Sequence, residues 1–185
     1  MHATHNTLAV NIREQSIELL NKHLAAAIDL HAQMKQAHWN VRGPSFISIH
    51  ELFDKVSAEV EEYSDQIAER AGSLGGTAYG TVQMAAERSF LIPYPLGIAD
   101  ETQHIFAVAA ALAAFGQSAR EAIKLADGYG DADTADLFTQ VSRGIDQQLW
   151  FVEAHIDPQK KHPQPNTDMR LIKNSAKNSK VKAVL

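Results

Sequence analysis

Apolar residues recur every three or four positions along most of this chain, the spacing that places side chains on one face of an α-helix. In the first such stretch Leu20, Leu24 and Ala27 follow this spacing, and His31 and His38 share their face. The pattern predicts four long helices, over residues 7–41, 46–71, 100–126 and 133–156. A shorter helix is predicted near residues 81–88.

Glycine, proline and capping residues separate the predicted helices. Gly43 and Pro44 end the first helix, and Ser45 is placed to cap the second through its hydroxyl group. Asp100 is a suitable N-cap for the third helix, and Asp133 can cap the fourth. Two glycines in the segment between them predict a break there.

The connection over residues 72–99 is too long for a tight turn, and its two prolines favour an extended link. Two long helices, a long crossover and two more long helices form the ferritin-like four-helix arrangement. A chain of 185 residues suits one domain. We therefore expect an all-α bundle over residues 8–157, with a short N-terminal tail over 1–7 and a basic, flexible tail over 158–185.

The composition narrows the classes of protein to consider. There is no cysteine, which excludes disulfide bonds and thiolate metal sites and fits a cytoplasmic protein. No apolar run approaches the roughly 18 residues of a membrane span, and no signal peptide is visible. The net charge of −5 hides an asymmetry, because the chain after Pro158 carries seven basic residues and one acidic residue. An acidic body with a basic tail indicates two different tasks.

Candidate metal ligands follow the first two predicted helices. His50 and Asp54 are four residues apart, and so are Asp65 and Glu69, so each pair projects from one helical face. At about 100° per residue all four positions fall within one stripe of the second helix. His50 and Glu69 are nevertheless separated by about 28 Å along the axis, at about 1.5 Å per residue. One ion cannot be bound by both ends of the same helix.

The two pairs are mirrored about a point next to Val60. If two copies of this helix pack antiparallel about a two-fold axis there, His50 meets Glu69 of the mate and Asp54 meets its Asp65. With His38 added from the first helix, two imidazoles and three carboxylates would surround a metal. This set suits iron, and zinc would bind it as well. The alternative is that each of the five is an ordinary surface or hydrogen-bonded residue.

An intrachain di-iron bundle is disfavoured, because it requires two helices that each carry a Glu-x-x-His motif. Only Glu101 and His104 fit that motif, and they stand at a predicted helix start, where surface capping is the simpler interpretation.

Three segments of the chain resemble the Dps family of mini-ferritins, which protect DNA during starvation. They are KQAHWNVRGPSFISIHELFD, EEYSDQIAERAGSLGG and DADTADLFTQVSRGIDQQLWFVEAHI, and the resemblance extends from about Leu8 to Asp157. It implies a hollow shell of twelve subunits with ferroxidase sites at two-fold interfaces. The implied iron ligands are His38, His50 and Asp54 from one subunit and Asp65 and Glu69 from the other.

The resemblance also implies roles for residues outside the ligand set. Trp39 matches an aromatic beside the site, where it would supply electrons that quench radicals or simply pack at a helix end. Three acids match residues near three-fold pores through which Fe²⁺ would be drawn by electrostatic focusing. These acids are Asp133, Asp136 and Asp146, and the alternatives are a helix cap for the first and a solvated face for the last.

Several other residues have a simpler interpretation. Glu61 and Glu62 would nucleate mineral if they faced the cavity, but an acidic pair on a helix is usually solvated. His31 is expected to be a buried, hydrogen-bonded side chain, and His2 and His5 are expected to have no role.

The function that this resemblance implies is iron detoxification. Fe²⁺ would be oxidised at the shared sites, with hydrogen peroxide favoured over dioxygen, and stored as ferric mineral. One alternative is a nucleoid-associated protein that compacts DNA through its lysine-rich tail, which a gel shift without residues 158–185 would distinguish. The other is a shell whose sites hold zinc and oxidise little iron.

Overall fold

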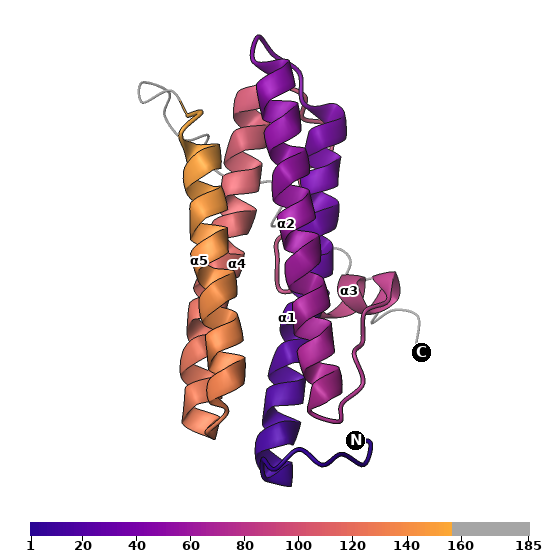
Figure 1. The fold of residues 1–185 in the computed structure, drawn as a ribbon. Coiled ribbons are helices and arrows are strands. Elements are labelled where there is room, and N and C mark those ends of the chain that lie inside the picture. The colour runs from indigo at the N-terminus through magenta and orange to yellow at the C-terminus, as the bar shows by residue number, and fades with distance from the viewer. Residues whose placement is uncertain (157–185) are drawn as a thin grey trace, which may run out of the picture.

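The computed structural model describes residues 1–156 and confirms the all-α bundle (Figure 1). Its helices are α1 (Val10–Asn40), α2 (Phe46–Ser73), α3 (Val82–Arg88), α4 (Glu101–Tyr129) and α5 (Ala132–Glu153). None of the helices in this part of the chain is long and apolar enough to cross a membrane. The predicted C-terminal tail lies outside the described residues.

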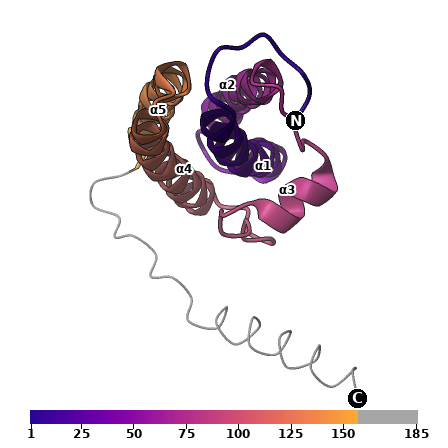
Figure 2. The ribbon, with the colours of Figure 1, turned by 90° about the horizontal axis from the view of Figure 1, so that it is seen from below.

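The four long helices form two antiparallel hairpins, α1 with α2 and α4 with α5, and the crossover between the hairpins carries α3. Seen from one end, the four helices surround a common centre and α3 lies outside it, next to α1 (Figure 2). The short N-terminal segment crosses the end of α2, where the His2 backbone N–H donates to the Gly75 carbonyl at 2.7 Å.

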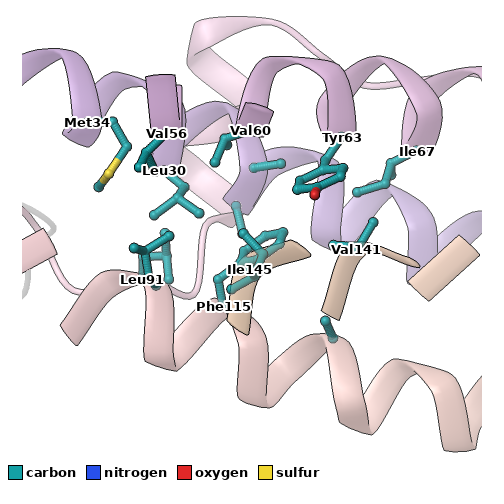
Figure 3. Close-up of a cluster of buried hydrophobic side chains, with 14 of the residues drawn as sticks. Leu30, Met34, Val56, Val60, Tyr63, Ile67, Leu91, Phe115, Val141 and Ile145 are labelled. Carbon is teal, nitrogen blue, oxygen red and sulfur yellow. The ribbon is translucent and has the colours of Figure 1, made fainter. Parts of the chain in front are cut away.

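The core lies between the two hairpins, because each helix directs its apolar stripe there. Large side chains from α1, α2, α4 and α5 meet in its middle (Figure 3). Leu30, Val60, Phe115 and Ile145 are fully buried. Tyr63 extends from α2 toward α5, where it lies against Gly144. This contact sets how closely the two hairpins approach on that side.

The predicted cap of the second helix is wrong in its chemistry. Ser45 occupies the N-cap position of α2, but its side chain accepts no capping hydrogen bond. Instead its backbone N–H donates to Glu101 Oε2, at 3.0 Å, so a carboxylate from the start of α4 holds the turn. The predicted cap of the third helix is confirmed, since Asp100 accepts from the backbone N–H groups of Thr102 and Gln103.

The boundary between the last two helices also differs from the prediction. The α4 helix continues past residue 126 to Tyr129 and ends at Gly130, whose φ of 88° is the left-handed conformation that glycine adopts readily. Asp131, rather than Asp133, caps α5, because its carboxylate accepts from the Thr134 backbone N–H at 3.1 Å. Arg70 of α2 donates to the same carboxylate, so tertiary contact selects this aspartate.

Candidate metal centre

His38 and His50 are brought face to face by the turn between α1 and α2. The imidazole rings stack with their centroids 3.7 Å apart and an angle of 20° between their planes. His38 stands in the last turn of α1, whereas His50 lies in the second turn of α2. They are twelve positions apart in the sequence, and the turn between α1 and α2 brings their side chains into contact.

Each imidazole is held by the backbone of the other histidine. His38 Nδ1 donates to the carbonyl oxygen of His50, and His50 Nδ1 donates to that of His38, both at 2.8 Å. A carbonyl oxygen can only accept, so both Nδ1 atoms carry hydrogen. In the neutral rings both Nε2 atoms therefore keep a free lone pair. Metal-binding histidines are commonly fixed in this way through the nitrogen that does not bind the metal.

Asp54 lies one turn beyond His50 on α2 and is also close to His38. Its Oδ1 is 4.0 Å from His38 Nδ1, and 55% of its side chain is exposed. Lys35 Nζ lies 2.5 Å from the same oxygen. Hydrogen bonding from this ammonium lowers the pKa of Asp54 below its ordinary value. The carboxylate is therefore ionised at neutral pH, as a metal ligand must be.

Lys35 is the site residue that the sequence analysis missed. It stands one turn before His38 on α1, so its spacing was a usable signal. Its ammonium also lies over the Trp39 ring, 5.9 Å from the centroid, in a cation–π contact. A metal ion that binds Asp54 must compete with this ammonium.

We predict that Lys35→Met strengthens metal binding, because the ion no longer competes with an ammonium for Asp54. An exposed ion pair contributes about 0.2–1 kcal/mol, so the apparent Kd should fall by at most about fivefold. Calorimetry with Zn²⁺ gives the Kd without redox chemistry. Lys55→Met is the matched control, because it removes the same charge from a lysine that contacts Phe151 instead. Equal effects of both variants would show that the Lys35–Asp54 contact is irrelevant.

Asp65 and Glu69 lie far along α2 from this cluster, and both are exposed. Within residues 1–156 the subunit contains no group of three histidine or acidic side chains close enough to hold a metal ion. The structure therefore brings His38, His50 and Asp54 near one another and leaves Asp65 and Glu69 apart. One subunit offers an incomplete site.

Apolar side chains are exposed around the histidine pair. Trp39 is 68% exposed and Ile47 is 61% exposed, while Phe46 lies beside His50 with ring centroids 5.0 Å apart. The indole of Trp39 is thus not packed at the helix end within its own subunit. Exposed apolar groups next to an incomplete site are typical of a surface that another subunit covers.

The acids that were assigned to a pore all lie on α5. Asp133 is 84% exposed and is 3.6 Å from Arg70 Nη1, and Asp136 is exposed as well. Asp146 forms an ion pair with Arg120 at 2.8 Å. All three carboxylates are exposed, and their role in iron entry stays a prediction.

The remaining acidic candidates lie on α2. Glu61 and Glu62 are exposed, and Glu62 accepts a hydrogen bond from Gln66 at 2.9 Å. Their solvated interpretation therefore holds within the subunit, and whether they face a shell cavity stays a prediction.

His31 and His104 are both held by hydrogen bonds within the subunit. His31 is partly buried and its Nδ1 hydrogen-bonds to the Ser57 carbonyl at 3.1 Å, as the simpler interpretation expected. His104 is fully buried, so the interpretation of Glu101 and His104 as surface capping residues is wrong. Glu101 holds the α1–α2 turn through Ser45, and His104 bonds to Tyr94.

Comparison with known proteins places the chain in a family. The ferritin-like domain model matches residues 17–161. A DNA protection during starvation protein from Agrobacterium fabrum is 42% identical over 84% of this chain and 96% of its own length. The chain belongs to the Dps family of ferritin-like proteins. Its resemblance to Dps and its predicted fold are thereby confirmed.

A solved structure and a second relative by sequence are also similar to this chain. Dps from Mycobacterium smegmatis superposes with a TM-score of 0.81 at 28% identity, covering 86% of this chain and 99% of that one. The fine tangled pili major subunit of Haemophilus ducreyi is 32% identical over 76% of this chain and 74% of its own. Membership in the Dps family thus settles the fold, and the activity is argued from the site.

Proposed function

We propose that this Dps protein oxidises Fe²⁺ at sites shared by two-fold-related subunits and stores the ferric product inside a shell of twelve subunits. Removal of Fe²⁺ together with peroxide would protect DNA from oxidative damage. The observation that carries the proposal is the reciprocal pairing of His38 and His50, which leaves the lone pairs of both Nε2 atoms available, with the ionised Asp54 lying 4.0 Å from His38 Nδ1. Histidines fixed through Nδ1 in this way are suited to binding a metal through Nε2.

The missing ligands are explained by a second copy of α2. The stripe that carries Asp54, Asp65 and Glu69 is exposed, opposite the buried face that carries Val56 and Val60. Ala58, near the centre of the stripe, is exposed and small, so two α2 helices can approach closely there. An antiparallel pair about a two-fold axis would bring Asp65 and Glu69 of each subunit to the histidine pair of the other.

The ligand set fits iron as a substrate that changes its oxidation state. Imidazole nitrogen suits Fe²⁺, and carboxylate oxygen suits harder ions such as Fe³⁺. With peroxide the balanced reaction is 2 Fe²⁺ + H₂O₂ → 2 Fe³⁺ + 2 OH⁻. The protein contributes placed ligands and a confined space rather than an acid or base. Asp133, Asp136 and Asp146 would attract Fe²⁺ to the shell, since their carboxylates are exposed.

The test is peroxide-driven iron oxidation by the assembled apo-protein. Fe²⁺ is added anaerobically, peroxide follows, and ferric absorbance is recorded. Asp54→Ala should slow the reaction at least about tenfold, because even the partners of metal ligands change activity by about 10–100-fold. Glu51→Ala is the matched control, since Glu51 is a nearby exposed acid of α2 outside the ligand set. A rate that Asp54→Ala leaves unchanged would rule the assignment out and favour a zinc-holding or DNA-binding protein.

A further inference from the structure

Tyr94 and His104 form a short hydrogen bond that the ferroxidase proposal does not use. Tyr94 Oη lies 2.6 Å from His104 Nδ1, and His104 Nε2 lies 3.1 Å from the Ile98 carbonyl oxygen. The carbonyl can only accept, so Nε2 carries the imidazole hydrogen and Nδ1 is the acceptor. Tyr94 therefore donates its phenolic hydrogen to a neutral imidazole.

This pair lies next to the end of α1 that carries the metal-binding histidine. The Arg42 backbone N–H donates to the Ala99 carbonyl at 2.8 Å, and Glu101 N–H donates to the Arg42 carbonyl at 3.0 Å. Arg42 stands two residues beyond the end of α1, so these backbone bonds join the start of α4 to the segment that bears Trp39 and His38.

A phenol that is hydrogen-bonded to an imidazole can lose an electron and its proton together. Its proton can pass to the hydrogen-bonded base at the same time, so the product is a neutral phenoxyl radical rather than a cation. Burial raises the pKa of Tyr94 above its ordinary value, so the proton is present at neutral pH. Burial lowers the pKa of His104, so the imidazole is neutral beforehand and returns the transferred proton readily.

Tyr63 is hydrogen-bonded to a different kind of acceptor. It donates to Glu59 Oε1 at 2.7 Å, a carboxylate oxygen rather than an imidazole nitrogen. Tyr79 is 46% exposed and stands in the link between α2 and α3. Of these three tyrosines, Tyr94 is the one whose phenolic hydrogen is donated to an imidazole.

We propose that Tyr94 and His104 form a one-electron relay that consumes the radical released when a single Fe²⁺ meets peroxide. The relay rests on the proposed iron oxidation. Fe²⁺ + H₂O₂ gives Fe³⁺ + OH⁻ + HO•. HO• takes one electron from Tyr94 and becomes OH⁻, while the phenolic proton moves to His104 Nδ1. A second Fe²⁺ then returns an electron to the phenoxyl oxygen, and the proton moves back, which completes 2 Fe²⁺ + H₂O₂ → 2 Fe³⁺ + 2 OH⁻.

Electron paramagnetic resonance of the assembled full-length protein tests the relay. Samples loaded with Fe²⁺ are frozen rapidly after peroxide is added, and free hydroxyl radical is measured in parallel with a spin trap. We expect a tyrosyl signal in the parent protein and in Tyr79→Phe. Tyr94→Phe should lose that signal and release more trapped radical, while circular dichroism verifies its fold.

An iron-free arm separates failure of the relay from failure of the proposed function. A ruthenium polypyridyl, photo-oxidised in the presence of persulfate, removes one electron from the protein. The tyrosyl signal should again depend on Tyr94, and His104→Gln should reduce it because an amide is not a base. Iron oxidation without a Tyr94 radical would overturn the relay alone. If iron oxidation is absent while the photochemical radical still forms, the proposed function is wrong, and the relay that rests on it is wrong as well. Loss of the tyrosyl signal in Tyr63→Phe, with the signal retained in Tyr94→Phe, would assign the radical to Tyr63 and overturn the relay.

Discussion

Shells of Asp54→Ala subunits and shells of Glu69→Ala subunits should each be inactive, yet subunits from the two should regain iron oxidation when they are dissociated and reassembled together. In a mixed two-fold pair one site contains both defects. The other combines an intact His38, His50 and Asp54 with an intact Asp65 and Glu69. Random pairing makes half of the pairs mixed, so about a quarter of all sites should be intact.

The initial rate of peroxide-driven oxidation measures this recovery. We expect about a quarter of the parent rate, from two preparations that are each at least about tenfold slower than the parent. The matched control mixes Asp54→Ala with His50→Ala. Both defects then lie in the same half of the site, so every mixed pair remains defective at both sites. Recovery in that control, or none in the first mixture, would contradict a site divided between subunits as we describe it.

Gly144→Ala should destabilise the bundle by about 2 kcal/mol, because its Cβ would lie 1.7 Å from Tyr63 Oη and 2.8 Å from Cζ. The Tyr63 ring is buried and cannot swing into solvent (Figure 3). Overpacking of this kind costs about 1–3 kcal/mol or more, which exceeds the gain of about 1 kcal/mol that alanine brings to a helix. The temperature of unfolding of the assembled protein measures the loss.

Gly128→Ala is the control for that experiment. Gly128 lies in α4, its added Cβ would meet nothing within 4 Å, and alanine should therefore stabilise the helix by up to about 1 kcal/mol. The double variant Gly144→Ala with Tyr63→Phe should recover part of the loss, because the clashing hydroxyl is gone. If the Gly144→Ala and Gly128→Ala proteins unfolded at the same temperature, the close contact between Tyr63 and Gly144 would not limit the stability of the bundle.

The helices of this protein could be predicted well because their signals are local. Apolar spacing of three and four identified the four long helices, a short helix was expected in the crossover, and Asp100 was recognised as a cap from its type and position. The caps at Ser45 and Asp133 were predicted wrongly for a shared reason. Glu101 and Arg70, both remote in sequence from those positions, decide which polar groups the helix starts use.

For the candidate site as well, local spacing predicted some features and the tertiary structure decided the others. Helical spacing was enough to select His50 and Asp54, because residues at regular intervals share a face before any folding is known, and His38 was added from the preceding helix. It gave no sign that the two imidazoles bond to each other's backbone, since that geometry depends on how the α1–α2 turn closes. The competing ammonium of Lys35 was overlooked because a lysine beside acids on a helix is ordinarily a solvated ion pair.

Periodicity and residue type are properties of the chain itself, so they carry the all-α class, the long crossover and the mirrored acids of α2. Contacts between residues far apart in sequence cannot be predicted in this way, because closing a loop brings together groups that no local pattern relates. The burial of His104 with Tyr94, the approach of Tyr63 to Gly144 and the stacked histidine pair all belong to this second kind. The histidine pair depends on how the α1–α2 turn closes, and the other two contacts depend on how separate elements pack together. Both are set by the folded chain rather than by any one segment.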